Sequence, residues 1–139
     1  MTPTQNAAAP TILNPAALHD PTPNGYSAIV VAPAGCRLAF VSGLGGQDAR
    51  GELSPDFAEQ VRQAYGNLAA ALEALGADPA RVVKLTVFVV DHNMSKLGPL
   101  TEAVTGMFGD HLPAQTLVPV PKLAVDLMLF EVEAVAALG

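Results

Sequence analysis

The chain has 139 residues and a formal net charge of −6, and half of its residues are hydrophobic while 14% are charged. This length is typical of a single domain. The acidic balance argues against nucleic acid as a partner, because sequence-independent binding to phosphate backbones needs clustered Lys and Arg. No apolar run approaches the roughly 20 residues that cross a bilayer. The apolar excess must therefore be buried in protein, within the fold or between subunits.

Residues 1–24 are predicted to form an extended N-terminal arm, because they carry several prolines and no hydrophobic periodicity. Met1 to Pro10 has neither the basic stretch nor the apolar stretch of a secretory signal, so we expect a cytoplasmic protein without a membrane partner. Residues 25–139 are expected to form one domain.

Two apolar stretches, Ser27 to Ala32 and Arg37 to Ser42, flank a turn at residues 33–35 and predict a hairpin. A helix is expected to follow, with Ser54 as N-cap and Pro55 at the first helical position. Apolar residues recur in it at three- and four-residue spacing, and Gly76 is expected to end it.

The segment from Arg81 to Val90 alternates in the manner of a strand. This pattern predicts a central strand that is covered on both faces. One face is expected to carry Val83, Leu85, Val87 and Val89, and the other Lys84, Thr86, Phe88 and Val90.

A second helical pattern covers residues 97–108, with Asn93 or Ser95 as its cap and Pro99 in its first turn. Strands near residues 114–120 and 127–136 complete the order ββαβαββ. We therefore expect an α+β fold in which a sheet packs on two helices.

Two carboxylates, Glu131 and Glu133, interrupt the apolar final strand. Two positions apart, they project from the same face, about 7 Å from one another. A carboxylate is costly to bury unless it is paired or hydrogen-bonded. Either this face is exposed or paired at an interface, or it lines a site where a raised pKa would suit proton transfer.

Three other residues allow two interpretations each. Thr86 and Phe88 are either core residues or an apolar wall with a hydroxyl. Cys36, the only cysteine, is either a buried or edge-strand thiol or a reactive nucleophile, and no histidine lies near it in sequence.

No metal or cofactor is expected. The three histidines, His19, His92 and His111, lack the spacing of a metal site. The glycine-rich segment 43–46 is followed by no Lys-Ser/Thr and opens no helix, so it does not form a phosphate-binding loop.

Local strings spread through residues 24–137 together resemble the Rid family (reactive intermediate deaminases, YjgF-type). Each string alone is short, and their common order carries the resemblance. They are Gly25-Tyr26-Ser27, Phe40 to Gly43, Asp48 with Gly51 to Leu53, Gln60 to Gln63 with Asn67, Val82 to Val89, Asp91 to Asn93, Pro113-Ala114, and Glu131 to Ala134.

The resemblance implies a chorismate-mutase-like homotrimer with an inner barrel of three sheets, helices outside and small-molecule clefts between neighbouring subunits. It implies that Glu131 is catalytic and orients a water molecule. The implied ligand-binding positions are Tyr26, Gly43, Phe88, Gln115 and Leu117.

Gln115 stands where the resemblance implies an arginine that holds the carboxylate of a 2-imino or 2-enamino acid. A charge-assisted contact contributes about 1.5–3 kcal/mol, and a neutral amide lacks the charge and the fork of a guanidinium. The usual substrate would lose its anchor. Lys122 in the following loop either has a surface role or supplies a positive charge.

Two functions stay open at this point. One is hydrolysis of an imine, enamine or related C–N bond in a neutral or amide-bearing substrate. The other is a non-catalytic trimer that binds a small metabolite. Cleavage of RNA, a third function attached to the family, is opposed by the acidic chain.

Overall fold

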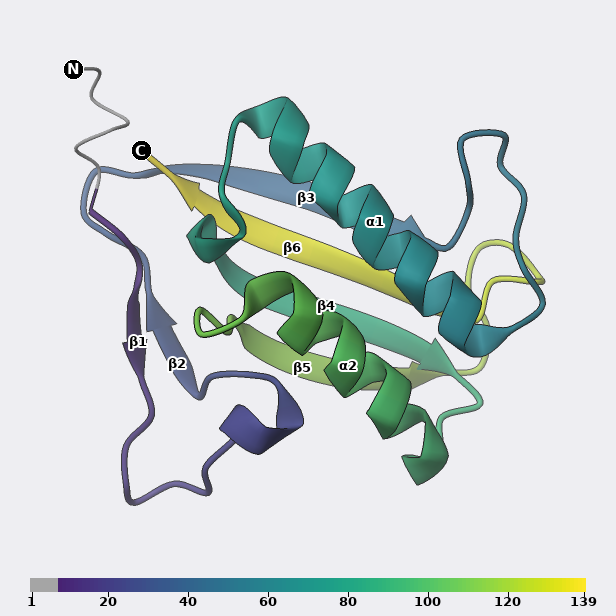
Figure 1. The fold of residues 1–139 in the computed structure, drawn as a ribbon, viewed down its shortest axis with the longest axis horizontal. Helices are drawn as coiled ribbons and strands as arrows, with labels where there is room; N and C mark the ends of the chain where they lie inside the picture. The colour runs from purple at the N-terminus through teal and green to yellow at the C-terminus, as the bar shows by residue number, and fades with distance from the viewer. Residues whose placement is uncertain (1–7) are drawn as a thin grey trace.

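A computed structural model describes residues 8–139 and contains a four-stranded sheet and two α-helices. The helices cover one face of this sheet (Figure 1). The two helices and the mixed sheets confirm the predicted α+β class. In chain order the elements are β1 (Thr11–Leu13), η2 (Thr22–Asn24), β2 (Ile29–Val31), β3 (Arg37–Gly45), α1 (Phe57–Leu75), η3 (Pro79–Arg81), β4 (Val82–Val90), η4 (Met94–Lys96), α2 (Leu97–Phe108), β5 (Ala114–Val120) and β6 (Phe130–Leu138).

The main sheet has the strand order β3-β6-β4-β5. β6 runs antiparallel to both β3 and β4, whereas β4 and β5 are parallel. β4 is thus an interior strand, as its alternating pattern predicts. Within residues 8–139, α1 and α2 do not combine the length and hydropathy of a membrane-spanning helix.

The predicted hairpin between Ser27–Ala32 and Arg37–Ser42 is wrong. β2 pairs instead with β1, in a separate two-stranded sheet, while β3 pairs along most of its length with β6. The long antiparallel ladder with β6 outcompetes local pairing across residues 33–35. The predicted N-terminal arm therefore contributes a short strand, and its residues 1–7 lie outside the described part of the chain.

α1 begins two residues later than the sequence predicts. Asp56 is the N-cap, and its carboxylate accepts a hydrogen bond of 3.0 Å from the backbone N–H of Glu59. Ser54 caps the preceding turn instead, since its hydroxyl accepts from the N–H of Asp56. The helix ends at Gly76 as predicted, in a left-handed conformation with φ of 66°.

Asn93 caps the short helix η4 rather than α2 itself. Its side chain accepts a hydrogen bond from the N–H of Ser95, and η4 leads directly into α2. Pro99 lies in the first turn of α2, as predicted, where its missing N–H costs no helical hydrogen bond.

A β-bulge changes the predicted faces of β4. Val82 pairs with Ala136 and Lys84 with Val135, which leaves Val83 as the extra residue. Val82 therefore joins Leu85 on the buried face, and the prediction that Val83 lies there is wrong.

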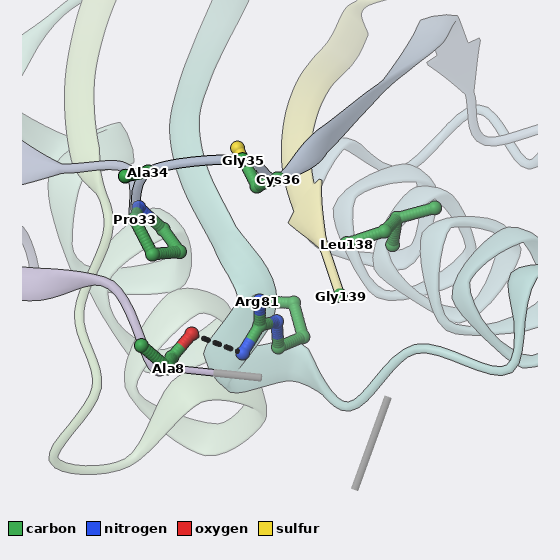
Figure 2. A pocket seen from close by; sticks show the side chains of 8 residues that line it. All are labelled: Ala8, Pro33, Ala34, Gly35, Cys36, Arg81, Leu138 and Gly139. Carbon is green, nitrogen blue, oxygen red and sulfur yellow. Dashed lines mark hydrogen bonds between the residues drawn. The ribbon is translucent and has the colours of Figure 1, made fainter. Parts of the chain in front are cut away.

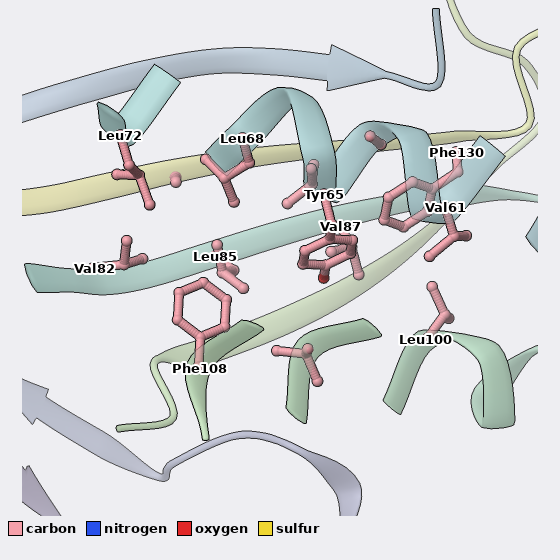
Figure 3. Close-up of a cluster of buried hydrophobic side chains, with 14 of the residues drawn as sticks. Val61, Tyr65, Leu68, Leu72, Val82, Leu85, Val87, Leu100, Phe108 and Phe130 are labelled. Atoms are coloured by element: carbon pink, nitrogen blue, oxygen red, sulfur yellow. The ribbon is translucent and has the colours of Figure 1, made fainter. Parts of the chain in front are cut away.

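The core lies between the sheet and the helices (Figure 3). Phe130 of β6 is fully buried there, and its ring meets Phe57 edge-on and stacks on Tyr65 with centroids 5.9 Å apart. Burial of each large apolar side chain contributes about 1.5–3 kcal/mol. This packing holds β6, the strand that carries both glutamates, against α1.

The other face of the sheet, which we call the open face, is covered by no described helix (Figure 1). Leu38 and Phe40 project from it, and Phe40 is 75% exposed. Phe40 pairs with Val135, which lies on the same face of β6 as the two glutamates. An exposed aromatic residue on an uncovered sheet is typical of a surface that another protein copy buries.

Candidate functional site

Three predicted site residues meet on the open face: Gly43 of β3, Phe88 of β4 and Glu131 of β6. We call them the carboxylate cluster. Glu131 is half-buried and lies directly opposite Phe88 in the β4–β6 pairing. The backbone of Gly43 packs so closely on Glu131 that a Cβ there would lie 2.5 Å from the carboxylate carbon. Glycine at position 43 thus makes room for the carboxylate.

A bulge in β3 produces this close approach. Val41 pairs with Ala134 and Leu44 with Val132, so β3 contributes one more residue than β6 between these pairs. Bulges bend a strand and redirect its backbone, often next to functional sites. Here the extra residue falls at Ser42-Gly43, beside Glu131.

The Glu131 carboxylate has no protein partner within residues 8–139, by hydrogen bond or ion pair. Glu133, on the same face, is exposed and lies opposite Thr86. The lysine of this face, Lys84, donates instead to the hydroxyl of Thr116 over 2.8 Å. The oxygens of Glu131 are therefore available to accept hydrogen bonds from water or a ligand.

A buried amide of α1, Gln60, fixes the start of β6. Its Nε2 donates to the carbonyls of Ser54 and Leu127 at 2.7 and 2.9 Å, and its Oε1 accepts from the N–H of Leu129 at 2.8 Å. Gln60 is fully buried. Sequence reasoning missed this role, although a glutamine next to Val61 on the inward face of an amphipathic helix was a usable signal.

A second amide of α1 fixes the end of β3. Asn67 donates through Nδ2 to the carbonyls of Gly45 and Gln47, at 2.9 and 2.8 Å. Gln63 donates in turn to the Asn67 side-chain oxygen. α1 thus positions both strands whose contact forms the carboxylate cluster.

The other predicted site residues lie at the edge strand β5: Gln115 and Leu117 belong to it, and the backbone next to Tyr26 meets its start. We call Tyr26, Gln115 and Leu117 the edge cluster. Gln115 and Leu117 lie opposite Leu85 and Val87, so they share the helix-covered side of the sheet. Tyr26 precedes Ser27, whose N–H donates to the carbonyl of Pro113 at the start of β5.

The side-chain oxygen of Gln115 is unsatisfied within the described residues. This atom, Oε1, is buried and has no hydrogen-bond partner there. A buried, unpaired polar group costs roughly 1–3 kcal/mol, so this oxygen is an acceptor that a suitable donor would stabilise.

One subunit does not bring the two clusters together. β4 lies between β5 and β6, which places these two strands about 10 Å apart across the sheet. Gln115 pairs with Leu85 and Glu131 with Phe88, so the two residues are also offset by three positions, or about 10 Å, along the strand direction. The two side chains also leave opposite faces of the sheet. A single ligand could contact both clusters only if they come from different copies.

Lys122 does not supply a charge to either cluster in this chain. Its ammonium pairs with Asp126 at 3.3 Å, and both side chains are largely exposed. This position agrees with the surface interpretation.

A separate hollow of about 150 Å³ lies between Cys36 and Arg81 (Figure 2). Arg81 donates through Nε to the carbonyl of Ala137 and through Nη1 to that of Ala8. The hollow adjoins Leu138, seven residues or about 23 Å along β6 from Glu131. Cys36 is therefore remote from the carboxylate cluster. No three His, Cys, Asp or Glu side chains in the described chain gather as metal ligands.

Comparison with known proteins places this geometry in a family. A family model described as endoribonuclease L-PSP matches residues 18–138. The chain belongs to this family. Solved members also carry the names Rid and YjgF, which confirms the resemblance drawn from the sequence motifs.

Relatives of known name include 2-iminobutanoate/2-iminopropanoate deaminases. The one from Rattus norvegicus is 37% identical over 105 residues, which cover 74% of each chain. The one from Escherichia coli K12 is 36% identical over 89 residues, 62% of this chain and 67% of the relative. A RutC family protein of Pyrococcus horikoshii is 36% identical over 81 residues, and the match spans 62% of its length.

Among solved structures, a Rid protein of unknown function from Yersinia pestis superposes with a TM-score of 0.88. It is 29% identical, and the match covers 94% of this chain and 99% of that one. The Escherichia coli YjgF structure is also 29% identical, with a TM-score of 0.64 over 78% of this chain and 86% of the other.

Proposed function

We propose that three copies of this Rid-family chain assemble through their open faces, and that each contact forms a cleft for a small, uncharged molecule with a C–N bond. The carboxylate cluster of one copy and the edge cluster of its neighbour line the cleft. The observation that carries the proposal is Glu131, whose carboxylate rests on Gly43 and has no protein partner within residues 8–139.

The open face supports the assembly. Leu38 and Phe40 are half or more exposed on it. Burial of apolar area stabilises association by about 25 cal/mol per Å² before the entropic costs of binding. A second copy covers these side chains without any change in the fold.

Assembly also accounts for the divided site. Gln115 sits on the sheet's edge strand, where its buried Oε1 has no hydrogen-bond partner within residues 8–139. A neighbouring copy that presents Glu131 near this edge would place a carboxylate and an amide on the two sides of one ligand.

The chemistry of Gln115 selects the ligand. Its amide offers one carbonyl acceptor and one NH₂ donor, both neutral. A primary amide or a hydroxyl group satisfies them, whereas a carboxylate gains no charge pairing. We therefore assign the cleft a neutral or amide-bearing ligand rather than the imino acids named for its relatives.

Hydrolysis of an imine needs little from the protein. Glu131 accepts a proton from a bound water while the water oxygen bonds to the imine carbon, and the proton passes to the nitrogen. Glu131 then takes the hydroxyl proton of the resulting carbinolamine and passes it to the nitrogen. The C=O bond forms as the C–N bond breaks, which releases ammonia and leaves a carbonyl compound. The reaction written in this way uses no cofactor.

Binding without turnover is the second function that one observation favours. Gln115 removes the charge that would anchor an imino acid, so the cleft can hold a small metabolite that it does not convert. The endoribonuclease description of the family is not carried over, because a chain of net charge −6 is poorly suited to a polyanion.

An ammonia-release assay separates these functions. The probes are 2-iminobutanoate and its neutral primary amide, 2-iminobutanamide, each generated in situ. We expect acceleration for the amide alone, lost in Glu131→Gln and kept in the control Glu133→Gln. Acceleration of neither probe, together with saturable binding of 2-oxobutanamide, would establish the binding function. Equal acceleration of both probes would contradict the role given to Gln115.

A further inference from the structure

A hollow on the helix side of the molecule is unrelated to either cluster. It has a volume of about 250 Å³ and lies between α1 and α2. Its walls include Ala58 and Tyr65 from α1, and Pro99, Ala103 and Gly106 from α2. A cavity of about 150 Å³ is large enough to bind benzene in another protein. This hollow therefore accommodates a substituted aromatic ring.

Tyr65 gives the hollow a polar group at its base. The residue is 94% buried, since only 6% of its surface is exposed. Its hydroxyl forms no hydrogen bond within the described residues. The unpaired polar atoms that are fully shielded from solvent belong to Arg81, His92 and Gln115, so the Tyr65 hydroxyl is not fully shielded. A buried phenol normally finds a hydrogen-bond partner. This hydroxyl instead keeps contact with the hollow, between the two helices (Figure 3).

The charges at the mouth limit the ligand further. Arg62 and Glu102 line the hollow, but Arg62 is already paired with Glu59 at 2.7 Å. Glu102 has no such partner in the described chain. Because Arg62 is paired with Glu59, which lies outside the lining, the Glu102 carboxylate is the unpaired charge at the mouth. It disfavours anions and favours neutral or amine-bearing molecules.

We propose that the hollow between α1 and α2 is a second binding site, for a compact, largely apolar molecule that is neutral or carries an amine and that hydrogen-bonds to the Tyr65 hydroxyl. Burial raises the pKa of this phenol above its ordinary value, so it is protonated and able to donate at neutral pH. The site faces away from the open face, so assembly through that face leaves it accessible (Figure 1).

Three aromatic probes test the site on the full chain: phenol, benzylamine and benzoate. In ¹H–¹⁵N NMR titrations we expect phenol and benzylamine to cause saturable shifts at Ala58, Tyr65 and Ala103, with Kd on the order of 1 mM. Benzoate should bind at least several-fold more weakly. Tyr65→Phe keeps the ring stacked on Phe130 and should weaken phenol binding about 2- to 10-fold, as expected for one neutral hydrogen bond.

A filled hollow provides the sharper control. A Cβ at Gly106 meets no atom within 4 Å, so Gly106→Leu should fold and then occupy the hollow. We expect it to abolish phenol binding. Gly66→Leu makes the same change at an equally open helical position, on α1 and outside the lining, and binding should persist. Shifts that do not saturate, or that survive Gly106→Leu, would overturn the proposal.

Discussion

The Glu131 carboxylate occupies the space that a side chain at position 43 would need, since a Cβ on Gly43 would lie 2.5 Å from its carboxylate carbon. One strand therefore lacks a side chain where its neighbour places a charged group. The clash involves the end of a flexible side chain. A side chain at position 43 would therefore displace the Glu131 carboxylate and leave the fold intact.

Gly43→Ala tests this relationship. We expect the Glu131 carboxylate to be displaced, so that ligand binding or ammonia release falls at least tenfold. The free energy of unfolding should change by less than about 1 kcal/mol, because the displaced end of Glu131 reaches solvent. Urea unfolding and the ammonia assay measure the two effects. The control Gly66→Ala, at an open helical position, should keep function and gain up to about 1 kcal/mol in stability. Full function in Gly43→Ala would show that the contact is unimportant.

Gln60→Leu tests the amide that joins α1 to β6. The variant leaves the Ser54 and Leu127 carbonyls and the Leu129 N–H without their partner. We expect a loss of about 2–4 kcal/mol in the free energy of unfolding, measured in urea. The exposed Gln63 is the matched control, and Gln63→Leu should cost less than about 0.5 kcal/mol. Equal effects in the two variants would refute the special role of Gln60.

Gln115→Arg tests the ligand preference of the cleft. A guanidinium should add about 1.5–3 kcal/mol of charge-assisted binding, so a carboxylate ligand such as 2-oxobutanoate should bind about 10- to 150-fold more tightly. Isothermal titration calorimetry measures the change. Gln115→Lys adds a charge without the planar fork and should gain less, and Gln63→Arg on the surface should gain nothing. If Gln115→Arg fails to bind carboxylates, position 115 does not face the ligand.

Tyr65 makes stability depend on pH in the alkaline range. Its folded pKa lies above the ordinary value of about 10, because burial disfavours the phenolate. The stabilising contribution is complete below the unfolded pKa and is lost as the pH rises above it towards the folded pKa. We expect the free energy of unfolding to fall above about pH 10, by up to 1.4 kcal/mol per pH unit. Tyr65→Phe should reduce this slope, while Tyr26→Phe, which removes the other tyrosine, should reduce it less.

Local patterns predict much of this fold. Gly76 ends α1 because glycine adopts the left-handed conformation at the lowest energetic cost, and a glycine after a helical pattern is visible in the sequence. The alternation of β4 likewise predicts that Leu85, Val87 and Val89 share a face, and all three are buried in the core. Ordered family motifs, rather than periodicity, predict Gly43 as a site residue.

Pairing and bulges were beyond local prediction. The hairpin prediction failed because β3 finds its partner in β6, nearly 100 residues along the chain. The prediction that Val83 lies on the buried face was wrong because one extra residue in β4 shifts the alternation. The sequence also could not show that Gln115 and Glu131 leave opposite faces of the sheet, since that depends on the strand order.

The central claim is that Glu131 and Gln115 of different copies face one cleft. Its most direct test is cross-linking between two single variants, Glu131→Cys and Gln115→Cys, each in a Cys36→Ser background without other cysteines. Co-refolded in equal amounts and treated with a short bismaleimide, the two should yield a covalent dimer that contains one chain of each kind. Each variant alone should give little of it. Absence of the mixed dimer, although a monofunctional maleimide labels both cysteines, would contradict the account.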